Sequence, residues 1–180
     1  MTNIVYIATS LDGYIADKNN QVDWLHDIQN KDGSDMGYAD LMDRIDVIVM
    51  GKNTFDLVAS FDGDWPYTKP VVVLSQSMKT IPNGCEDKIQ IMSGNPQQIM
   101  QQIKTLGFKN AYIDGGNTIQ QFLQANLIDE LIITTIPVLL GGGISLFGSL
   151  EQPIKCEIQY SNVFSNEIVQ SGYLINKKQI

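Results

Sequence analysis

The sequence has few of the residues on which most nucleophilic and metal sites depend. It contains one histidine, His26, and two cysteines, Cys85 and Cys156, which form no C-x-x-C pair. We therefore predict no metal site, and a Ser-His-Asp or Cys-His mechanism would have to rest on His26 alone. We interpret His26 as a surface residue, because residues 23–27 form a polar, loop-like stretch. The widely spaced cysteines favour reduced thiols, as in a cytoplasmic protein, over a disulfide.

Positive charge is also scarce. Arg44 is the only arginine, and 12 basic residues are outnumbered by 20 acidic ones, which gives a net charge of -8. No run of lysine or arginine occurs, so we expect neither nucleic acid nor a membrane surface as a partner. No apolar run approaches the roughly 20 residues that span a bilayer, and the first residues lack the features of a signal peptide. We expect a cytoplasmic protein that binds a small molecule.

What is present describes an ordinary globular chain. Of its 180 residues, 43% are hydrophobic and 18% are charged. This length supports one domain whose core needs no disulfide or metal to be stable. There is no repeat, linker or low-complexity tail, so we predict a single domain over residues 1–180.

The most informative stretch, residues 111–143, predicts a βαβ unit. An apolar strand precedes a turn at Gly115 and Gly116, where the absence of side chains allows backbone angles that other residues avoid. An amphipathic helix and a second apolar strand follow. This order implies parallel strands joined by a right-handed crossover. The segments are the strand Ala111–Ile113, the turn 114–117, the helical face of Ile119, Phe122 and Leu123, the strand Leu127–Ile136 and the loop Gly141–Gly143.

The turn at Gly115 and Gly116 has two interpretations. Amide groups at a helix N-terminus attract anions, and a diphosphate can approach a backbone that carries no side chains. The glycines can equally serve a tight strand-to-helix turn, and the motif is not G-x-G-x-x-G, so both interpretations stay open. Gly51 begins a second junction of this kind. Lys52 beside it is either a phosphate contact or a solvated surface residue.

The remaining segments complete an α/β pattern with apolar strands and amphipathic helices. The other predicted strands are Asn3–Thr9, Asp46–Met50, Pro70–Leu74 and Ile89–Met92, followed by an antiparallel hairpin of Cys156–Phe164 and Glu167–Ile175. The other predicted helices are Met36–Arg44, one after Gly51 with Phe55 and Val58, and one after Pro96 with Ile99, Ile103 and Leu106 on one face. Residues 10–20 are predicted as turn and loop, and residues 144–150 as irregular.

Three loop positions could contact a ligand. Asp12 follows the first buried strand, where ligands often bind in α/β sheets, although Asp12-Gly13 is also an ordinary turn signal. Trp24 is either a cover for the core or a surface on which a ligand stacks. Ser75 and Ser77 follow the third strand, and small hydroxyl side chains there suit a ribose or a phosphate.

Five segments, taken in order, resemble the bacterial dihydrofolate-reductase-like proteins that are similar to the carboxyl-terminal reductase domain of RibD. Their order and spacing cover nearly the whole chain. The resemblance implies a three-layer α/β sandwich with a mostly parallel central sheet and an antiparallel carboxyl-terminal hairpin. It also implies a homodimer and NADPH-dependent hydride transfer to a C=N or C=O group of a pterin, a pyrimidine or a related heterocycle. The segments are Ala8–Ala16, Val49–Phe55, Val72–Ser75, Ile113–Gly116, and Asp129–Leu131 with Pro137 and Leu140–Gly143.

The resemblance also assigns roles to residues. Both glycine junctions contact phosphates, the third strand's end lies along the adenosine, and Ala8 and Ile15 flank the nicotinamide. The implied cofactor set is Ala8, Ile15, Gly51, Lys52, Asn53, Thr54, Leu74, Ser75, Gln76, Ser77, Gly115, Gly116, Asn117, Thr118 and Ile119. We place on the substrate side Asp12, Trp24, Tyr38, Phe55 and Thr134. Asp35 lies near the position of the carboxylate that assists protonation in folate reductases, and its alternative role is that of a helix cap.

The sequence departs from the family at its basic positions. Lys52 stands where relatives have arginine, and Gln76 stands near a position that is often basic, so NADPH is expected without excluding NADH. Tyr14 replaces a lysine, and the basic residues that hold a ribose phosphate are not evident. These departures argue against the riboflavin-pathway substrate itself. The alternatives are a true dihydrofolate reductase and a non-catalytic dimer that binds a nucleotide or another small ligand.

Overall fold

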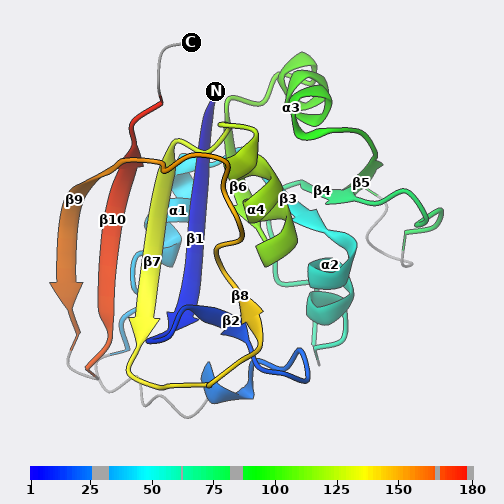
Figure 1. Ribbon diagram of the computed structural model, residues 1–180. Helices are drawn as coiled ribbons and strands as arrows, with labels where there is room; N and C mark the ends of the chain where they lie inside the picture. The colour runs from blue at the N-terminus through cyan, green and yellow to red at the C-terminus, as the bar shows by residue number, and fades with distance from the viewer. Residues whose placement is uncertain (26–32, 62, 82–86, 165–166, 178–180) are drawn as a thin grey trace.

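A central eight-stranded sheet organises the computed structural model (Figure 1), which describes residues 1–25, 33–61, 63–81, 87–164 and 167–177. The strands of the sheet, in spatial order, are β5 (Ile89–Met92), β4 (Val71–Leu74), β3 (Val47–Gly51), β6 (Asn110–Asp114), β1 (Thr2–Ser10), β7 (Glu130–Ile136), β10 (Val169–Ile175) and β9 (Cys156–Val163). A separate two-stranded sheet pairs β2 (Tyr14–Ala16) with β8 (Ile144–Ser145). The helices are the 3-10 turn η1 (Asp23–Leu25), α1 (Tyr38–Arg44), α2 (Lys52–Ala59), α3 (Pro96–Thr105) and α4 (Gly116–Gln124).

The sheet is parallel except at its carboxyl-terminal hairpin. β1 runs parallel to β6 and β7, and β3 runs parallel to β4 and β6. β10 pairs antiparallel with β7 and with β9. The predicted mostly parallel sheet with an antiparallel hairpin is therefore confirmed.

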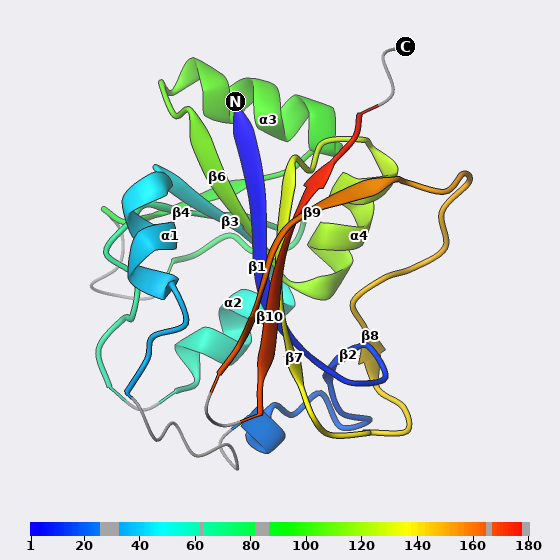
Figure 2. The ribbon, with the colours of Figure 1, turned by 90° about the vertical axis from the view of Figure 1, so that its left-hand side faces the viewer.

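Helices cover both faces of the sheet, as an edge-on view shows (Figure 2). One core lies under α3 and α4 and includes Ile103 and Phe122, both almost fully buried. The other core lies under α1 and α2 and includes Leu41 and Phe55. Neighbouring strand residues such as Ile4 and Val5 enter opposite cores, because side chains alternate along a strand. The predicted three-layer sandwich is confirmed.

The structure corrects two loop predictions. Tyr14–Ala16 and Ile144–Ser145, expected as loop and irregular chain, form the short strands β2 and β8. Each is too short to show a periodic pattern, and its partner is distant in sequence, so nothing local indicates the pairing. In the same segment Leu146 is fully buried.

Element ends were predicted less accurately than element types. Helix α1 begins at Tyr38 instead of Met36, because Met36 and Gly37 both have positive φ angles, 54° and 84°. β7 begins at Glu130, three residues after the predicted Leu127. Leu106, expected on the buried face of α3, is the C-cap of that helix and is 50% exposed. His26 and Cys85 lie outside the described residues. None of the described helices is long and apolar enough to cross a membrane.

Replacing Phe122 by alanine tests the core under α4. The ring is 1% exposed, so its removal leaves a cavity against the sheet. We expect the free energy of unfolding to fall by about 3–5 kcal/mol. Leu106→Ala on the neighbouring helix is the control, with an expected change within about 0.5 kcal/mol. Urea unfolding at one pH measures both, and equal losses would contradict the burial of Phe122 in the core under α4.

Candidate active site

The carboxyl ends of the parallel strands meet at one edge of the sheet, which is the lower edge in Figure 1. The chain leaves β3 through α2 towards β4, but it leaves the adjacent β6 through α4 towards β7 on the other side. β3 and β6 are hydrogen-bonded neighbours, with Met50 opposite Asp114. A crevice at such a reversal of strand order is where ligands bind in open α/β sheets. We call this place the switch point.

The two glycine junctions face each other at the switch point. A Cβ atom on Gly115 would collide with the Oγ1 atom of Thr54 at the start of α2. A Cβ atom on Gly51 would lie 3.0 Å from the Oγ1 atom of Thr118 at the start of α4. The sequence predicted that these junctions share one rim, and they do. Their glycines also permit close packing of the two helix starts, so the ligand and tight-turn interpretations are not exclusive.

Neither of these helices has a side chain that caps its first turn. The N-cap residues of α2 and α4 are Gly51 and Gly115, and neither helix has a side-chain cap hydrogen bond. By contrast, Asn95 and Gln98 form a complete capping box on α3. Backbone N–H groups of a first turn need another acceptor. Two such turns side by side can bind a diphosphate, and Asn53 and Asn117 there are exposed.

The sheet opens between β1 and β6 beside the switch point. Their ladder consists of Thr2 with Asn110, Asn3 with Ala111 and Ile4 with Tyr112, and it stops there. Beyond it, β1 continues to pair with β7 as far as Ser10, and β6 continues with β3 as far as Asp114. The Tyr6 carbonyl accepts a hydrogen bond from the Tyr112 hydroxyl at 2.9 Å. We call this opening the split; Ala8 and Asp114 are on the strands at its two sides.

A loop clamp holds the chain after β1 against the start of α4. Asp12 accepts hydrogen bonds from the amides of Leu140 and Gly141, at 3.1 and 2.8 Å. A Cβ atom on Gly116 would lie 2.7 Å from Cδ1 of Ile15, so Ile15 packs directly on the glycine turn. The structure therefore places Ile15 at the predicted cofactor side. It shows Asp12, assigned to the substrate side, as the residue that joins these loops.

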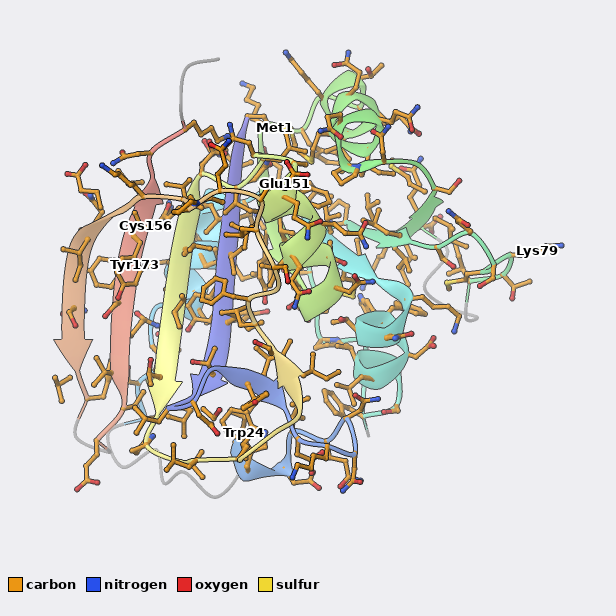
Figure 3. All side chains as sticks on the ribbon, in the orientation of Figure 1. Met1, Trp24, Lys79, Glu151, Cys156 and Tyr173 are labelled. Carbon is orange, nitrogen blue, oxygen red and sulfur yellow. The ribbon has the colours of Figure 1, made fainter. Side chains whose placement is uncertain are left out.

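The end of β4 contributes a hollow of about 490 Å³ beside the start of α2. Ser77 lines it, as do Lys52 and Lys79. Ser75 accepts hydrogen bonds from the amides of Ser77 and Met78 and so shapes the turn, while Leu74 and Gln76 flank it. Lys52 forms an ion pair with Asp56. Lys79 was not predicted as a site residue, and Figure 3 shows its side chain extending outward from the molecule.

Asp114, at the end of β6, is a partly buried carboxyl group at the split. Its Oδ1 atom accepts a hydrogen bond from the Gly115 amide at 2.8 Å. Burial raises the pKa of Asp114 to about 6, although the Gly115 amide and the Tyr112 hydroxyl favour the charged form. Burial, followed by the charge of Asp114, also raises the pKa of Tyr38 and Tyr67. Asp114 therefore exchanges a proton near neutral pH, whereas the tyrosines remain protonated.

Two groups of aromatic rings lie on the face of the sheet that carries α1 and α2, and each contains a tyrosine, Tyr38 or Tyr67, on which the charge of Asp114 acts. Tyr6 and Tyr38 form one edge-to-face pair, with ring centres 6.1 Å apart. Trp65 contacts both Phe55 and Tyr67, each at 5.5 Å. The Nε1 atom of Trp65 is buried and has no hydrogen-bond acceptor among the described residues.

The predicted proton donor, Asp35, has different surroundings. It is exposed and accepts hydrogen bonds from the amides of Gly37 and Ala39, each at 2.9 Å. The Ala39 and Gly37 amides lower the pKa of Asp35. These are the contacts of a helix cap, so the structure favours the cap over the proton donor.

The other residues assigned to the substrate are distributed around the site. Tyr38 borders Asp114, but Phe55 is 2% exposed and belongs to the core. Thr134 is buried on β7 and accepts a hydrogen bond from Gln170 at 3.1 Å. Trp24 lies at the carboxyl edge of the sheet (Figure 3), and its Nε1 atom is buried without a partner in the described chain. The structure thus brings Tyr38 to the split and places Phe55 and Thr134 beneath the surface.

Sequence reasoning missed Asp114, Lys79, Trp65 and Tyr67 as site residues. Asp114 was interpreted only as the first residue of the turn that ends a strand, although a carboxylate directly before two glycines was visible in the sequence. Trp65 and Tyr67 belong to a loop whose contacts no pattern reveals. Among the described residues, no three histidine, cysteine, aspartate or glutamate side chains gather as a metal site would require.

Comparison with known proteins gives a consistent result. The family model of the RibD C-terminal domain matches residues 2–170. YwjB of Bacillus subtilis (strain 168), itself uncharacterized, is 31% identical over 174 residues, which are 95% of this chain and 96% of YwjB. A Shewanella sp. PV-4 crystal structure, provisionally assigned to riboflavin biosynthesis, is 50% identical with a TM-score of 0.94, and the match covers 98% and 99% of the two chains. Dihydrofolate reductase from Enterococcus faecalis, complexed with NADP(H), matches with a TM-score of 0.65 at 14% identity. The match covers 97% of this chain and 96% of that one, and it shows a shared fold.

Replacing Gly115 by alanine tests the contact between the two helix starts. Gly115 has a φ angle of 87°, and the new methyl group would collide with Thr54. We expect a loss of about 2–4 kcal/mol in the free energy of unfolding. The double variant, which also carries Thr54→Ala, lacks the colliding oxygen. Its loss of unfolding free energy should therefore be smaller than the sum of the losses of the two single variants. Urea unfolding of all four proteins measures the coupling, and strict additivity would contradict the contact.

The raised pKa of Asp114 predicts a pH-dependent stability. The folded state holds this proton up to about pH 6, whereas the ordinary pKa is 3.8, so stability falls as pH rises between these values. Relative to Asp114→Asn, the wild type should lose about 1–3 kcal/mol of unfolding free energy between about pH 4 and about pH 7.5. Urea unfolding of both proteins at both pH values gives the difference. A constant difference would show that Asp114 titrates normally.

Proposed function

The chain belongs to the RibD C-terminal domain family, and we propose that it is an NADPH-dependent reductase that transfers hydride to a C=N or C=O carbon of a pterin, a pyrimidine or a related heterocycle. Membership in this family supports a reductase role. The cofactor and the substrate class are part of the proposal. The observation that carries it is the pair of helix starts, both without side-chain caps, that face each other at the switch point.

The residues at the switch point fit a dinucleotide. The first turns of α2 and α4 offer N–H groups to a diphosphate, and the helix dipoles favour its negative charge. Ala8, on one strand of the split, and Ile15, packed on Gly116, would border the nicotinamide. When bound, the reduced nicotinamide supplies the hydride. The chain would orient the substrate, exclude water beneath the loop clamp, and supply a proton for the atom next to the reduced carbon.

The hollow beside α2 supports a preference for NADPH over NADH. Lysine holds a phosphate as a point charge, so it can replace the arginine that relatives have at this place. Lys52 and Lys79 both line the hollow, together with the hydroxyl of Ser77. Because Lys52 is already paired with Asp56, Lys79 is the lysine that we expect to decide the preference.

Cofactor titration tests the proposal directly. NADPH and NADH are added separately while the fluorescence of Trp24 and Trp65 is followed. We expect NADPH to bind more tightly, and Lys79→Gln to weaken NADPH by about tenfold, or about 1.4 kcal/mol, while changing NADH by less than about twofold. Lys104→Gln, on α3, is the matched control and should change neither. No binding of NADPH at about 1 mM would refute the proposal.

Turnover separates the alternatives. NADPH oxidation is followed by absorbance in the presence of pterins, aminopyrimidines and quinoid compounds in turn. Reduction of dihydrofolate with inhibition by methotrexate would identify a true dihydrofolate reductase. Cofactor binding without oxidation against any of these compounds would favour a non-catalytic dimer. The homodimer itself remains a prediction from the family resemblance.

A further inference from the structure

We propose that the substrate of this reductase is a planar, basic nitrogen heterocycle without a phosphate group, and that Asp114 binds the nitrogen of its C=N bond and gives it the proton. This inference rests on the proposed function and deepens it. At the split, the Asp114 carboxyl group lies next to two groups of aromatic rings, and the described chain has no unpaired arginine.

The sheet itself positions Asp114. Tyr112 and Asp114 point to the same face of β6, because they are two residues apart, and Tyr112 belongs to the core under α1 and α2. On one side, Met50 of β3 is opposite Asp114. On the other side, Ala8 is on β1 beyond the point where the ladder with β6 ends. Asp114 is therefore beside the proposed nicotinamide position and towards α1 and α2.

Aromatic side chains shape the space next to this carboxyl group. Tyr38 comes from α1 and Tyr67 from the loop before β4, and the charge of Asp114 acts on both. Behind Tyr67 is Trp65, whose buried N–H group has no acceptor in the described chain. A buried donor of this kind calls for an explanation, and a ring oxygen or nitrogen of a bound heterocycle would accept its hydrogen bond. Flat aromatic walls favour a flat ligand.

The charges near the site disfavour a phosphate. Arg44, the only arginine in the sequence, forms an ion pair with Glu130. Lys52 is paired with Asp56. A phosphate placed beside Asp114 would meet this carboxylate without a free guanidinium to offset its charge, whereas a protonated ring nitrogen would be attracted.

The proposed step balances in protons and electrons. The Asp114 carboxyl group gives its proton to the ring nitrogen, and the hydride with its electron pair reaches the adjacent carbon from the reduced nicotinamide. The C=N π bond breaks, a C–H and an N–H bond form, and oxidised cofactor and the Asp114 carboxylate remain. The carboxylate then regains a proton from water. A pKa of about 6 suits this exchange, and Tyr38, Tyr67 and Tyr112, which face it from α1, the loop and β6, remain protonated because their pKa values are raised.

Binding of simple probes tests this inference without turnover. Calorimetric titrations use 2,4-diaminopyrimidine as the basic heterocycle and ribose 5-phosphate as the phosphate, each with the free protein and with the NADP⁺ complex. We expect the diaminopyrimidine to bind and ribose 5-phosphate not to bind. Asp114→Asn should weaken diaminopyrimidine at least tenfold, and Asp114→Glu, which keeps the charge, should weaken it less. Asp40→Asn removes a carboxylate on α1 that lines a groove without Asp114, so it is the matched control and should leave the affinity unchanged.

Each outcome decides the inference. Binding of ribose 5-phosphate in competition with the diaminopyrimidine would overturn it, as would equal affinity of the wild type and Asp114→Asn. Circular dichroism confirms that each variant is folded before titration. NADP⁺ is titrated alone in parallel, so a failure of cofactor binding would count against the proposed function, whereas the probe titration of the free protein would still decide the role of Asp114.

Discussion

The contact of Gly115 with Thr54 is the constraint on which the site depends. It brings the start of α4 against the start of α2, and the reciprocal approach of Gly51 and Thr118 repeats it. Because β3 and β6 are adjacent and parallel, these two contacts fix both helix starts at one place. Any larger residue at Gly115 would push the starts apart and separate the N–H groups that a single diphosphate must reach together.

A second consequence of the same strand order is that the chemistry is divided between the two sides of the split. β6 is bonded to β3 for its whole length but to β1 only at its beginning, so the sheet opens where Asp114 ends the strand. α4 and the loop clamp belong to one side, where a cofactor would be held. α1 and the aromatic loop before β4 belong to the other, where a substrate would meet Asp114. The geometry that would bind the cofactor thus also positions the carboxyl group.

The sequence predicted what depends on local pattern and missed what depends on distant contacts. The strands, the helices and the shared rim of Gly51 and Gly115 followed from apolar periodicity and from strand–glycine–helix order. The pairing of β2 with β8 did not, because Tyr14 and Ser145 are brought together only by the completed fold. Asp114 was visible as a residue but not as a proton donor, because its pKa depends on burial at the split, which needs the structure. For Asp35 the outcome was reversed. Its position in the sequence suggested a proton donor, whereas its contacts in the structure are those of a helix cap.

The distribution of positive charge, more than the fold, underlies the substrate class that we propose. A fold can be retained while its substrate changes, so function must be argued from the side chains at the site. Here Lys52 and Lys79 line the hollow beside α2, where a cofactor phosphate would bind, and the only arginine is paired with Glu130. The face around Asp114 is left with this one carboxyl group, with tyrosines and with a buried indole N–H group. Such a face would attract a flat basic ring and repel a sugar phosphate, so the proposed cofactor site and the proposed substrate would both follow from where this sequence places its cations.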